Sequence, residues 1–169
     1  MKLIKPSFEI IEQKPRDIVI PADMEIGPRM WKDELINSVY RQIEIAGRTC
    51  YKSEDKITET SAKEFVDRMV KSGHGAMLEH GTVYLKVPNS VVDEGFQFGT
   101  NWSTLCLNPY TRYISDRDYY YYTTNYRVII EHDLQGVLEY LCEPTEYHAK
   151  RITVKFICDR GVSHKKFVA

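Results

Sequence analysis

The residues best suited to chemistry lie together at positions 73–80, in the sequence Gly-His-Gly-Ala-Met-Leu-Glu-His. Histidine and glutamate side chains can transfer protons or bind a ligand, and glycines let the backbone approach that ligand closely. His74, Glu79 and His80 are ligand types for a metal ion, but they are not spaced as the H-x-x-x-H zinc motif on a helix. The residues alone therefore leave open a ligand-binding loop and a pair of hydrogen-bonded structural histidines, and we expect no metal site.

Two other stretches, residues 47–53 and 159–164, each place a cation and hydroxyl groups beside a glycine. Such a group of side chains could hold a phosphate. Each stretch could equally be the end of a helix followed by a turn. The sequence contains no Gly-rich phosphate loop, G-x-S-x-G nucleophile or dinucleotide fingerprint, so it identifies no catalytic residue.

Helices are expected on both sides of the 73–80 cluster. Apolar residues spaced by three and four predict helices over residues 31–46, 61–71 and 133–142. Gly47 is expected to end the first helix. The second helix has the capping-box pair Ser61 and Glu64 at its start and Gly73 just beyond its end.

Strands are expected between these helices. Runs of β-branched and aromatic residues predict strands over residues 82–87, 126–131 and 151–158. Residues 88–125 show no period and are expected to form a long functional loop, in which Tyr119 to Tyr122 either stack on bases or cover a sheet edge or subunit contact. The predicted fold class is α+β, with a mixed β-sheet flanked by helices in a single domain over residues 1–169.

Composition agrees with an ordinary globular protein. The chain has 169 residues, of which 43% are hydrophobic and 28% charged, and no apolar stretch is long enough to span a membrane. The 23 Lys and Arg residues balance 24 Asp and Glu residues, so the charge does not indicate a nucleic-acid polymer as partner. The start lacks the features of a signal peptide, which predicts a cytoplasmic protein whose four cysteines are reduced and mostly buried.

A set of segments, taken in order, resembles a known family. AGRTCY (residues 46–51), KSGHGAMLEH (71–80) running into TVYLKV, and CEPTEYHAKRITVKFICDRGVSH (142–164) are similar to the N-terminal part of flavin-dependent thymidylate synthases. In that family a loop of the form G-H-x-(Ser/Thr)-x-x-E-H precedes a strand. The resemblance extends over most of residues 46–164 and includes TTNYRVI, as in the longer members of the family.

The resemblance implies a reductive methylation of dUMP to dTMP. The one-carbon unit would come from methylenetetrahydrofolate, and FAD reduced by NADPH would supply the hydride. The family acts as a homotetramer with FAD sites shared between subunits and uses no cysteine nucleophile. The implied partners are therefore dUMP, folate and further copies of the chain, with neither a nucleic-acid polymer nor a membrane.

The resemblance also implies four cofactor-binding positions. His74 matches the loop histidine that borders the flavin and the nucleotide, and Glu79 matches the glutamate of the loop motif. Ala76 stands where the loop has a Ser or Thr, so a contact there would use the backbone N–H, and Cys50 stands where a serine near the flavin is usual. His80 is expected to be structural.

One family feature is missing from this sequence. The Arg-His-Arg signature, which binds FAD and the nucleotide phosphate, is expected shortly after His164, where residues 165–169 read KKFVA instead. The resemblance therefore implies a truncated chain that is inactive alone. The alternative is a non-catalytic fragment, a regulatory or assembly module of the same fold that joins intact subunits through Tyr119 to Tyr122.

Overall fold

The computed structural model describes residues 5–17, 27–97 and 102–158. The chain divides into two compact units, one containing residues 13–150 and the other combining residues 1–12 with 151–169. None of the helices in the described ranges is long and apolar enough to cross a membrane.

The smaller unit contains a two-stranded antiparallel ribbon of β1 (Ser7–Ile11) and β5 (Thr153–Ile157). Phe8 lies opposite Phe156 and Ile10 lies opposite Val154, so these four apolar residues share one face. The predicted strand at residues 151–158 is thus confirmed over its centre. Its partner β1 was not expected from the sequence, because the segment is short and contains Glu9 among its apolar residues.

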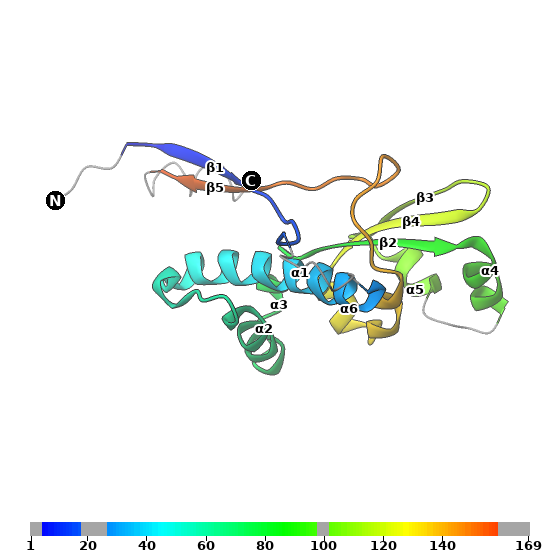
Figure 1. The fold of residues 1–169 in the computed structure, drawn as a ribbon, viewed down its shortest axis with the longest axis horizontal. Coiled ribbons are helices and arrows are strands. Elements are labelled where there is room, and N and C mark those ends of the chain that lie inside the picture. Colours follow the sequence, from blue (N-terminus) through cyan, green and yellow to red (C-terminus); the bar gives the residue numbers. More distant parts are fainter. Residues whose placement is uncertain (1–4, 18–26, 98–101, 159–169) are drawn as a thin grey trace. The chain divides into compact units, whose positions relative to one another are not determined.

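The larger unit is built on a three-stranded antiparallel sheet with the order β2-β4-β3 (Figure 1). Its strands are β2 (Thr82–Pro88), β3 (Arg112–Ser115) and β4 (Tyr119–Asn125). All strand pairs in the described residues are antiparallel, so the chain contains helices with small antiparallel sheets, and the expected mixed sheet is not found there.

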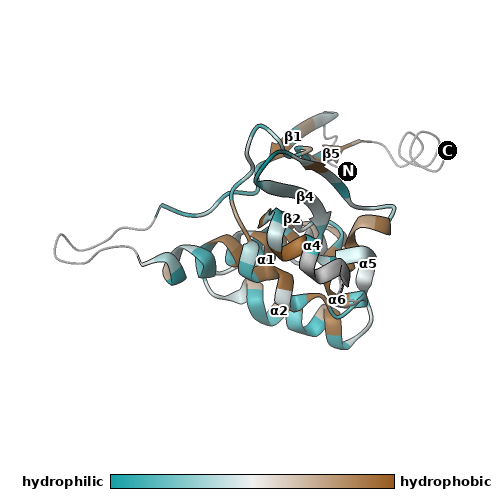
Figure 2. Cartoon of the chain, turned by 90° about the vertical axis from the view of Figure 1, so that its right-hand side faces the viewer, coloured by the Kyte–Doolittle hydropathy of each residue, from teal (hydrophilic) through white to brown (hydrophobic). Residues whose placement is uncertain are grey.

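Helices α1, α2 and α6 lie on one side of this sheet (Figure 1). The helical elements are α1 (Pro28–Tyr51), η1 (Glu54–Lys56), α2 (Ser61–Lys71), α3 (Gly75–Leu78), α4 (Asn89–Gln97), α5 (Trp102–Leu107), α6 (Tyr126–Glu131) and η2 (Gln135–Tyr140), where η marks a 3-10 helix. Figure 2 shows hydrophobic segments of these helices facing the sheet. The core between them includes Val39, Ile43, Phe65, Leu85 and Tyr122, each at most 2% exposed.

The opposite face of the sheet is crossed by the segment that follows η2. His148 in this segment is buried, with its ring edge-on to Tyr84 and Tyr121 at centroid distances of 5.3 and 5.5 Å. Its Nδ1 accepts a hydrogen bond from the Thr145 backbone N–H at 3.0 Å, which leaves Nε2 to donate to Leu85 O at 3.1 Å. Burial lowers the pKa of His148, so the neutral ring is the form that fits this site.

The first helix continues beyond its predicted end. Gly47 was expected to stop α1, but the helix runs on to Tyr51 and ends where Lys52 adopts left-handed backbone angles (φ 50°, ψ 51°). A Cβ atom at Gly47 would lie 2.5 Å from Cζ of Phe65 in α2. Gly47 therefore allows α1 and α2 to pack closely and does not act as a helix stop.

The predicted strand at residues 126–131 is wrong, because this segment forms helix α6. The Asn125 side-chain oxygen accepts a hydrogen bond from Val128 N at 3.0 Å, which caps the helix. Tyr126, Val128 and Ile129 are buried on the resulting helix. The strand in this region is β4, just before α6, so the capping Asn125 overrides the β-propensity of Val128 and the isoleucines.

Two other expectations differ from the structure. Residues 88–125 are not a loop, since they contain α4, α5, β3 and β4. The helix expected at residues 133–142 is reduced to the short 3-10 helix η2, and Asp133 before it has a positive φ of 55°. The helix predicted at residues 61–71 is confirmed as α2, although no side chain caps its first turn.

Candidate functional site

The histidine loop lies against the end of α1. His74 Nδ1 forms a hydrogen bond of 2.9 Å with the Tyr51 hydroxyl, and the two rings lie 6.3 Å apart between centroids. Both side chains are exposed. This contact joins residues 23 positions apart in the chain and brings the 46–51 segment to the 73–80 segment.

The end of α2 determines where His74 lies. Gly73 has a φ of 70°, its N–H donates to Val70 O, and His74 N–H donates to Met69 O at 3.0 Å. These bonds form a Schellman motif, which turns the chain sharply at the helix end and favours glycine at the left-handed position. His74 then precedes α3, so its ring projects from a turn between two helices.

Glu79 at the other end of the loop is held by α6. Nη1 of Arg127 donates to the Glu79 carboxylate at 2.5 Å, while Nε of Arg127 donates to Glu131 at 2.6 Å. The hydrogen bonds from Arg127 to Glu131 and Glu79 raise the pKa of Arg127. One guanidinium thus ties the loop to α6 with partly exposed charges.

Arg127 also lies over the start of α3. A Cβ atom on Gly75 would come within 3.0 Å of Arg127 Nε and 3.2 Å of the Glu131 carboxylate. A larger residue at this position would push against the ion pairs. Gly75 therefore serves close packing of the loop on α6, whereas the sequence indicated close approach of the backbone to a ligand.

A buried ion pair supports this end of α1. Arg48 Nε lies 2.6 Å from the Glu44 carboxylate, and their side chains are 8% and 1% exposed. Ser61 at the start of α2 donates to the other oxygen of Glu44 at 3.0 Å. The Arg48 guanidinium also lies 5.0 Å from the centre of the Phe65 ring. These contacts fix the helix turn that carries Cys50 and Tyr51 relative to α2.

The four predicted cofactor-binding residues are all accessible. Each of the four is exposed: His74, Ala76, Glu79 and Cys50. His74 contacts Tyr51 and Glu79 contacts Arg127, as described above. Cys50 is a free thiol. His80 is also exposed, and its ring has no hydrogen-bond partner in the described part of the chain.

Sequence reasoning missed two side chains of this cluster, Tyr51 and Arg127. Tyr51 was not singled out because the helix was expected to end at Gly47. Arg127 was assigned to a predicted strand at residues 126–131, so no contact between this residue and the loop was expected. The capping pattern of Asn125 followed by a helix-compatible segment was the signal that could have placed Arg127 correctly.

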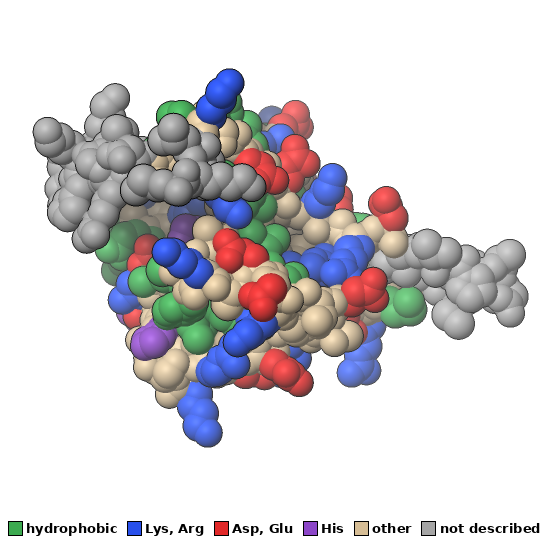
Figure 3. Space-filling model, turned by 90° about the vertical axis from the view of Figure 1, so that its left-hand side faces the viewer, with side chains coloured by type: hydrophobic (Ala, Val, Ile, Leu, Met, Phe, Trp, Pro, Cys, Tyr) green, Lys and Arg blue, Asp and Glu red, His purple; other side chains and the backbone are tan. Residues whose placement is uncertain are grey.

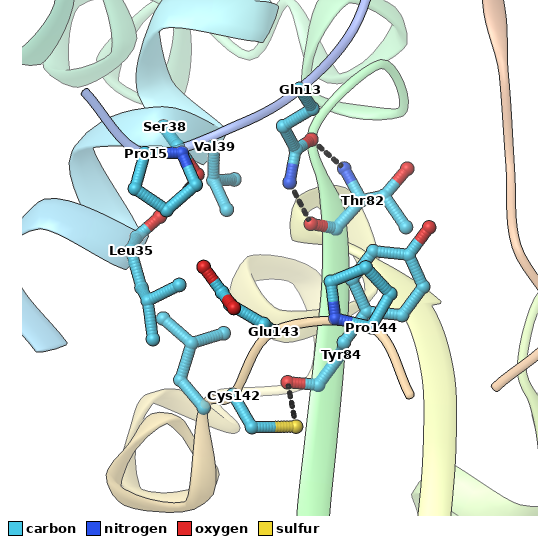
Figure 4. A pocket seen from close by; sticks show the side chains of 11 residues that line it. Gln13, Pro15, Leu35, Ser38, Val39, Thr82, Tyr84, Cys142, Glu143 and Pro144 are labelled. Carbon is cyan, nitrogen blue, oxygen red and sulfur yellow. Dashed lines mark hydrogen bonds between the residues drawn. The ribbon is translucent and has the colours of Figure 1, made fainter. Parts of the chain in front are cut away.

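Two concave regions elsewhere do not include the four predicted residues. A small cavity beside Gln13, Leu35, Tyr84 and Glu143 has a volume of about 20 Å³, enough for one water molecule (Figure 4). Gln13 closes it by exchanging two hydrogen bonds with the Thr82 backbone, at 2.7 and 2.8 Å. This cavity is far too small for a flavin.

The second concave region is a polar cleft of about 250 Å³ between α1 and the start of α2. Its charged lining residues are Arg16, Glu34, Arg41, Glu59 and Lys63. Arg41 is paired with Glu34 at 2.5 Å. Charges of both signs therefore line the cleft, which gives no preference for an anionic ligand.

The tyrosine run forms the central strand of the sheet. Tyr121 and Tyr122 are 5% and 0% exposed, and Tyr122 stacks on Trp102 at 5.9 Å. Burial raises the pKa of Tyr121 to about 12. These two rings therefore lie in the core of the sheet and are not available for stacking on a base, whereas Tyr119 and Tyr120 are partly buried.

Charges of both signs are mixed around this end of the larger unit. Figure 3 views the molecule from the side on which α1 ends, and Lys, Arg, Asp and Glu side chains alternate over the visible face. Within the described residues, no three His, Cys, Asp or Glu side chains gather into a group that could hold a metal ion.

Cys50 and Cys158 are exposed free thiols, whereas the cysteines were expected to be mostly buried.

The last of the segments that carry the family resemblance, residues 142–164, lies partly outside the described residues. Residues 142–158 include the buried His148 and strand β5, whereas the expected phosphate cluster at residues 159–164 lies beyond them.

Comparison of the chain with protein-family models, with curated proteins and with solved structures finds no match. The functional interpretation therefore depends on the residues and contacts described above.

Proposed function

We propose that this chain belongs to a flavin-dependent thymidylate synthase, which converts dUMP to dTMP with methylenetetrahydrofolate and NADPH. The proposal combines the sequence resemblance with the cluster formed by Tyr51, His74, Glu79 and Arg127. Each of these residues belongs to a segment that carries the resemblance, namely residues 46–51, 71–80 and TTNYRVI.

The observation that carries the proposal is the meeting of these three segments. The Tyr51 and His74 contact spans 23 positions, and the Glu79 and Arg127 contact spans 48. Segments that resemble a family by chance have no reason to adjoin in space. A shared site is a physical reason for separate motifs to lie together, because a ligand must contact them at the same time.

The cluster suits the ring portion of a flavin. Tyr51 and His74 present two exposed rings with a hydrogen bond between them, which fixes one imidazole nitrogen and leaves the other free for a ligand. The left-handed Gly73 turns the chain at the end of α2, directly before His74. A bound flavin would supply the hydride, while these residues would orient its ring.

The cluster does not provide for the diphosphate of FAD. Its one arginine, Arg127, and the Arg48 side chain of α1 are both already paired with carboxylates. Neither guanidinium is therefore free to balance a dianion. In this proposal the phosphate contacts come from other cations, and we assign no catalytic step to a residue of this chain.

Titration of the purified chain with FAD, followed by flavin fluorescence, tests the proposal. We expect saturable binding that is weakened in His74→Ala and retained in His80→Ala, a matched exposed histidine without a hydrogen bond to Tyr51. Thermal unfolding of both variants checks that they fold equally well. Absence of binding by the unaltered chain, or loss of binding only in His80→Ala, contradicts the proposal.

A further inference from the structure

Strand β3 forms an open edge of the larger unit's sheet. It is the last strand in the order β2-β4-β3, and all of its residues, Arg112–Ser115, are exposed. Tyr113 and Ile114 are 48% and 54% exposed, large fractions for apolar side chains on a strand. An exposed strand edge is a template for pairing with another strand.

The register shows which backbone groups of β3 point outward. Asp116 N–H donates to Tyr119 O at 3.0 Å, and this pair continues the register that places Ile114 opposite Tyr121. In an antiparallel ladder the hydrogen-bonded pairs alternate, so Ile114 also bonds toward β4. The N–H and C=O groups of Tyr113 and Ser115 therefore face away from the sheet, and no partner for them is found among the described residues.

We propose that β3 pairs antiparallel with β3 of a second copy of this chain, with Ile114 opposite Ile114 across a two-fold axis. The two three-stranded sheets then form one continuous sheet. This inference goes beyond the proposed function, because it does not require a flavin or a nucleotide. A two-fold contact of this kind uses the same surface on both copies.

Symmetry limits the possible registers. A two-fold axis perpendicular to the sheet keeps every side chain on its own face, so one residue of β3 must lie opposite itself. Pairing at Arg112 would place like charges together, and pairing at Ser115 would place Ile114 opposite Asp116. Both arrangements are unfavourable.

Pairing at Ile114 satisfies the exposed groups best. It places Tyr113 opposite Ser115 of the second copy, so the outward backbone groups bond to one another. It also places Arg112 opposite Asp116, a complementary pair on the same face as Ile114. The N–H groups of Asp118 and Tyr119 hold the pKa of Asp116 below its ordinary value, which keeps this carboxylate charged. Pairing at Tyr113 would instead place Arg112 opposite Ile114.

Disulfide trapping tests this register. Ile114→Cys is made in the full chain together with Cys50→Ser and Cys158→Ser, which remove the exposed thiols. Directly opposed residues lie about 5 Å apart between Cα atoms, within the range of a disulfide. The control Arg112→Cys in the same background places the two thiols about 14 Å apart, four residue steps along the strands.

Under mild oxidation we expect Ile114→Cys to form a covalent dimer at least about tenfold faster than Arg112→Cys, because only the first pair meets the distance limit. Sedimentation of the unaltered chain should show a dimer that Ile114→Lys converts to monomer with an unchanged circular dichroism spectrum. A monomeric unaltered chain, equal trapping at the two positions, or a dimer that Ile114→Lys leaves intact would each overturn the proposal.

Discussion

The buried pair of Glu44 and Arg48 is expected to control the stability of the candidate site. Both side chains are less than 10% exposed, and Ser61 adds a hydrogen bond to the same carboxylate. Removing one partner leaves a buried charge uncompensated, which costs about 3 to 5 kcal/mol. We therefore expect Glu44→Met to lower the unfolding free energy by this amount, with a fall in Tm of roughly 6 to 20 °C.

The reasoning is tested by a double-mutant cycle measured by urea unfolding. Replacing both partners, in Glu44→Met with Arg48→Met, removes the charges together and should recover most of the loss, to within about 1 to 2 kcal/mol of the unaltered chain. The coupling between the two changes would then be large. A loss below about 1 kcal/mol for Glu44→Met alone, the size typical of an exposed ion pair, would refute the account of this pair as a buried support.

Three further outcomes are expected. Gly47→Ala should destabilise the chain by about 1 to 3 kcal/mol through a clash with α2, whereas Gly136→Ala, with open space around it, should change stability by less than about 0.5 kcal/mol in the same urea assay. Burial lowers the pKa of His148, so the folded chain binds fewer protons at this residue than the unfolded chain does. The contribution of the neutral ring to the free energy of unfolding is therefore fully present above pH 6.5. It is lost as the pH falls from 6.5 through the lowered pKa. His148→Gln should reduce this pH dependence between pH 7.5 and 5.5, and an unchanged slope would contradict it. Iodoacetamide should label the exposed Cys50 before Cys142, whose pKa burial raises to about 11, and mass spectrometry of peptides would reveal the reverse order.

Elements with long-period apolar patterns could be predicted from the sequence. The stripe of Ala62, Phe65, Val66 and Met69 predicted α2, and Gly73 beyond its end was confirmed in the left-handed conformation. The run of β-branched and aromatic residues at 82–87 also predicted a strand correctly, and this strand, β2, is buried over most of its length. In these segments local preference and tertiary packing favour the same structure.

Elements whose structure depends on distant contacts could not be predicted. Gly47 has the local appearance of a helix stop, and only the position of Phe65 shows that its missing side chain makes room for α2. Segment 126–131 is rich in β-branched residues, yet its cap at Asn125 and its buried helical face determine a helix. The strands β3 and β4 lay in a segment without a clear period, because β4 is buried on both faces and β3 is exposed throughout.

In the candidate site, too, local features could be predicted from the sequence and contacts between distant residues could not. The sequence indicated His74 and Glu79 as neighbours in one loop. It did not indicate that Tyr51 and Arg127 would contact them, since these contacts follow from the length of α1 and the presence of α6. Local spacing identifies residues on one loop, whereas residues from other elements join them only through the fold.

Mapping the flavin by NMR tests the central claim most directly. The backbone amides of the ¹⁵N-labelled chain are followed while FAD is added. The proposed site predicts that the largest shifts occur together at Tyr51, His74, Ala76 and Arg127, which three separate segments contribute. Shifts confined to other residues, such as those around the polar cleft at Arg41 and Lys63, or no shifts at all, would contradict the claim that these segments form one flavin site.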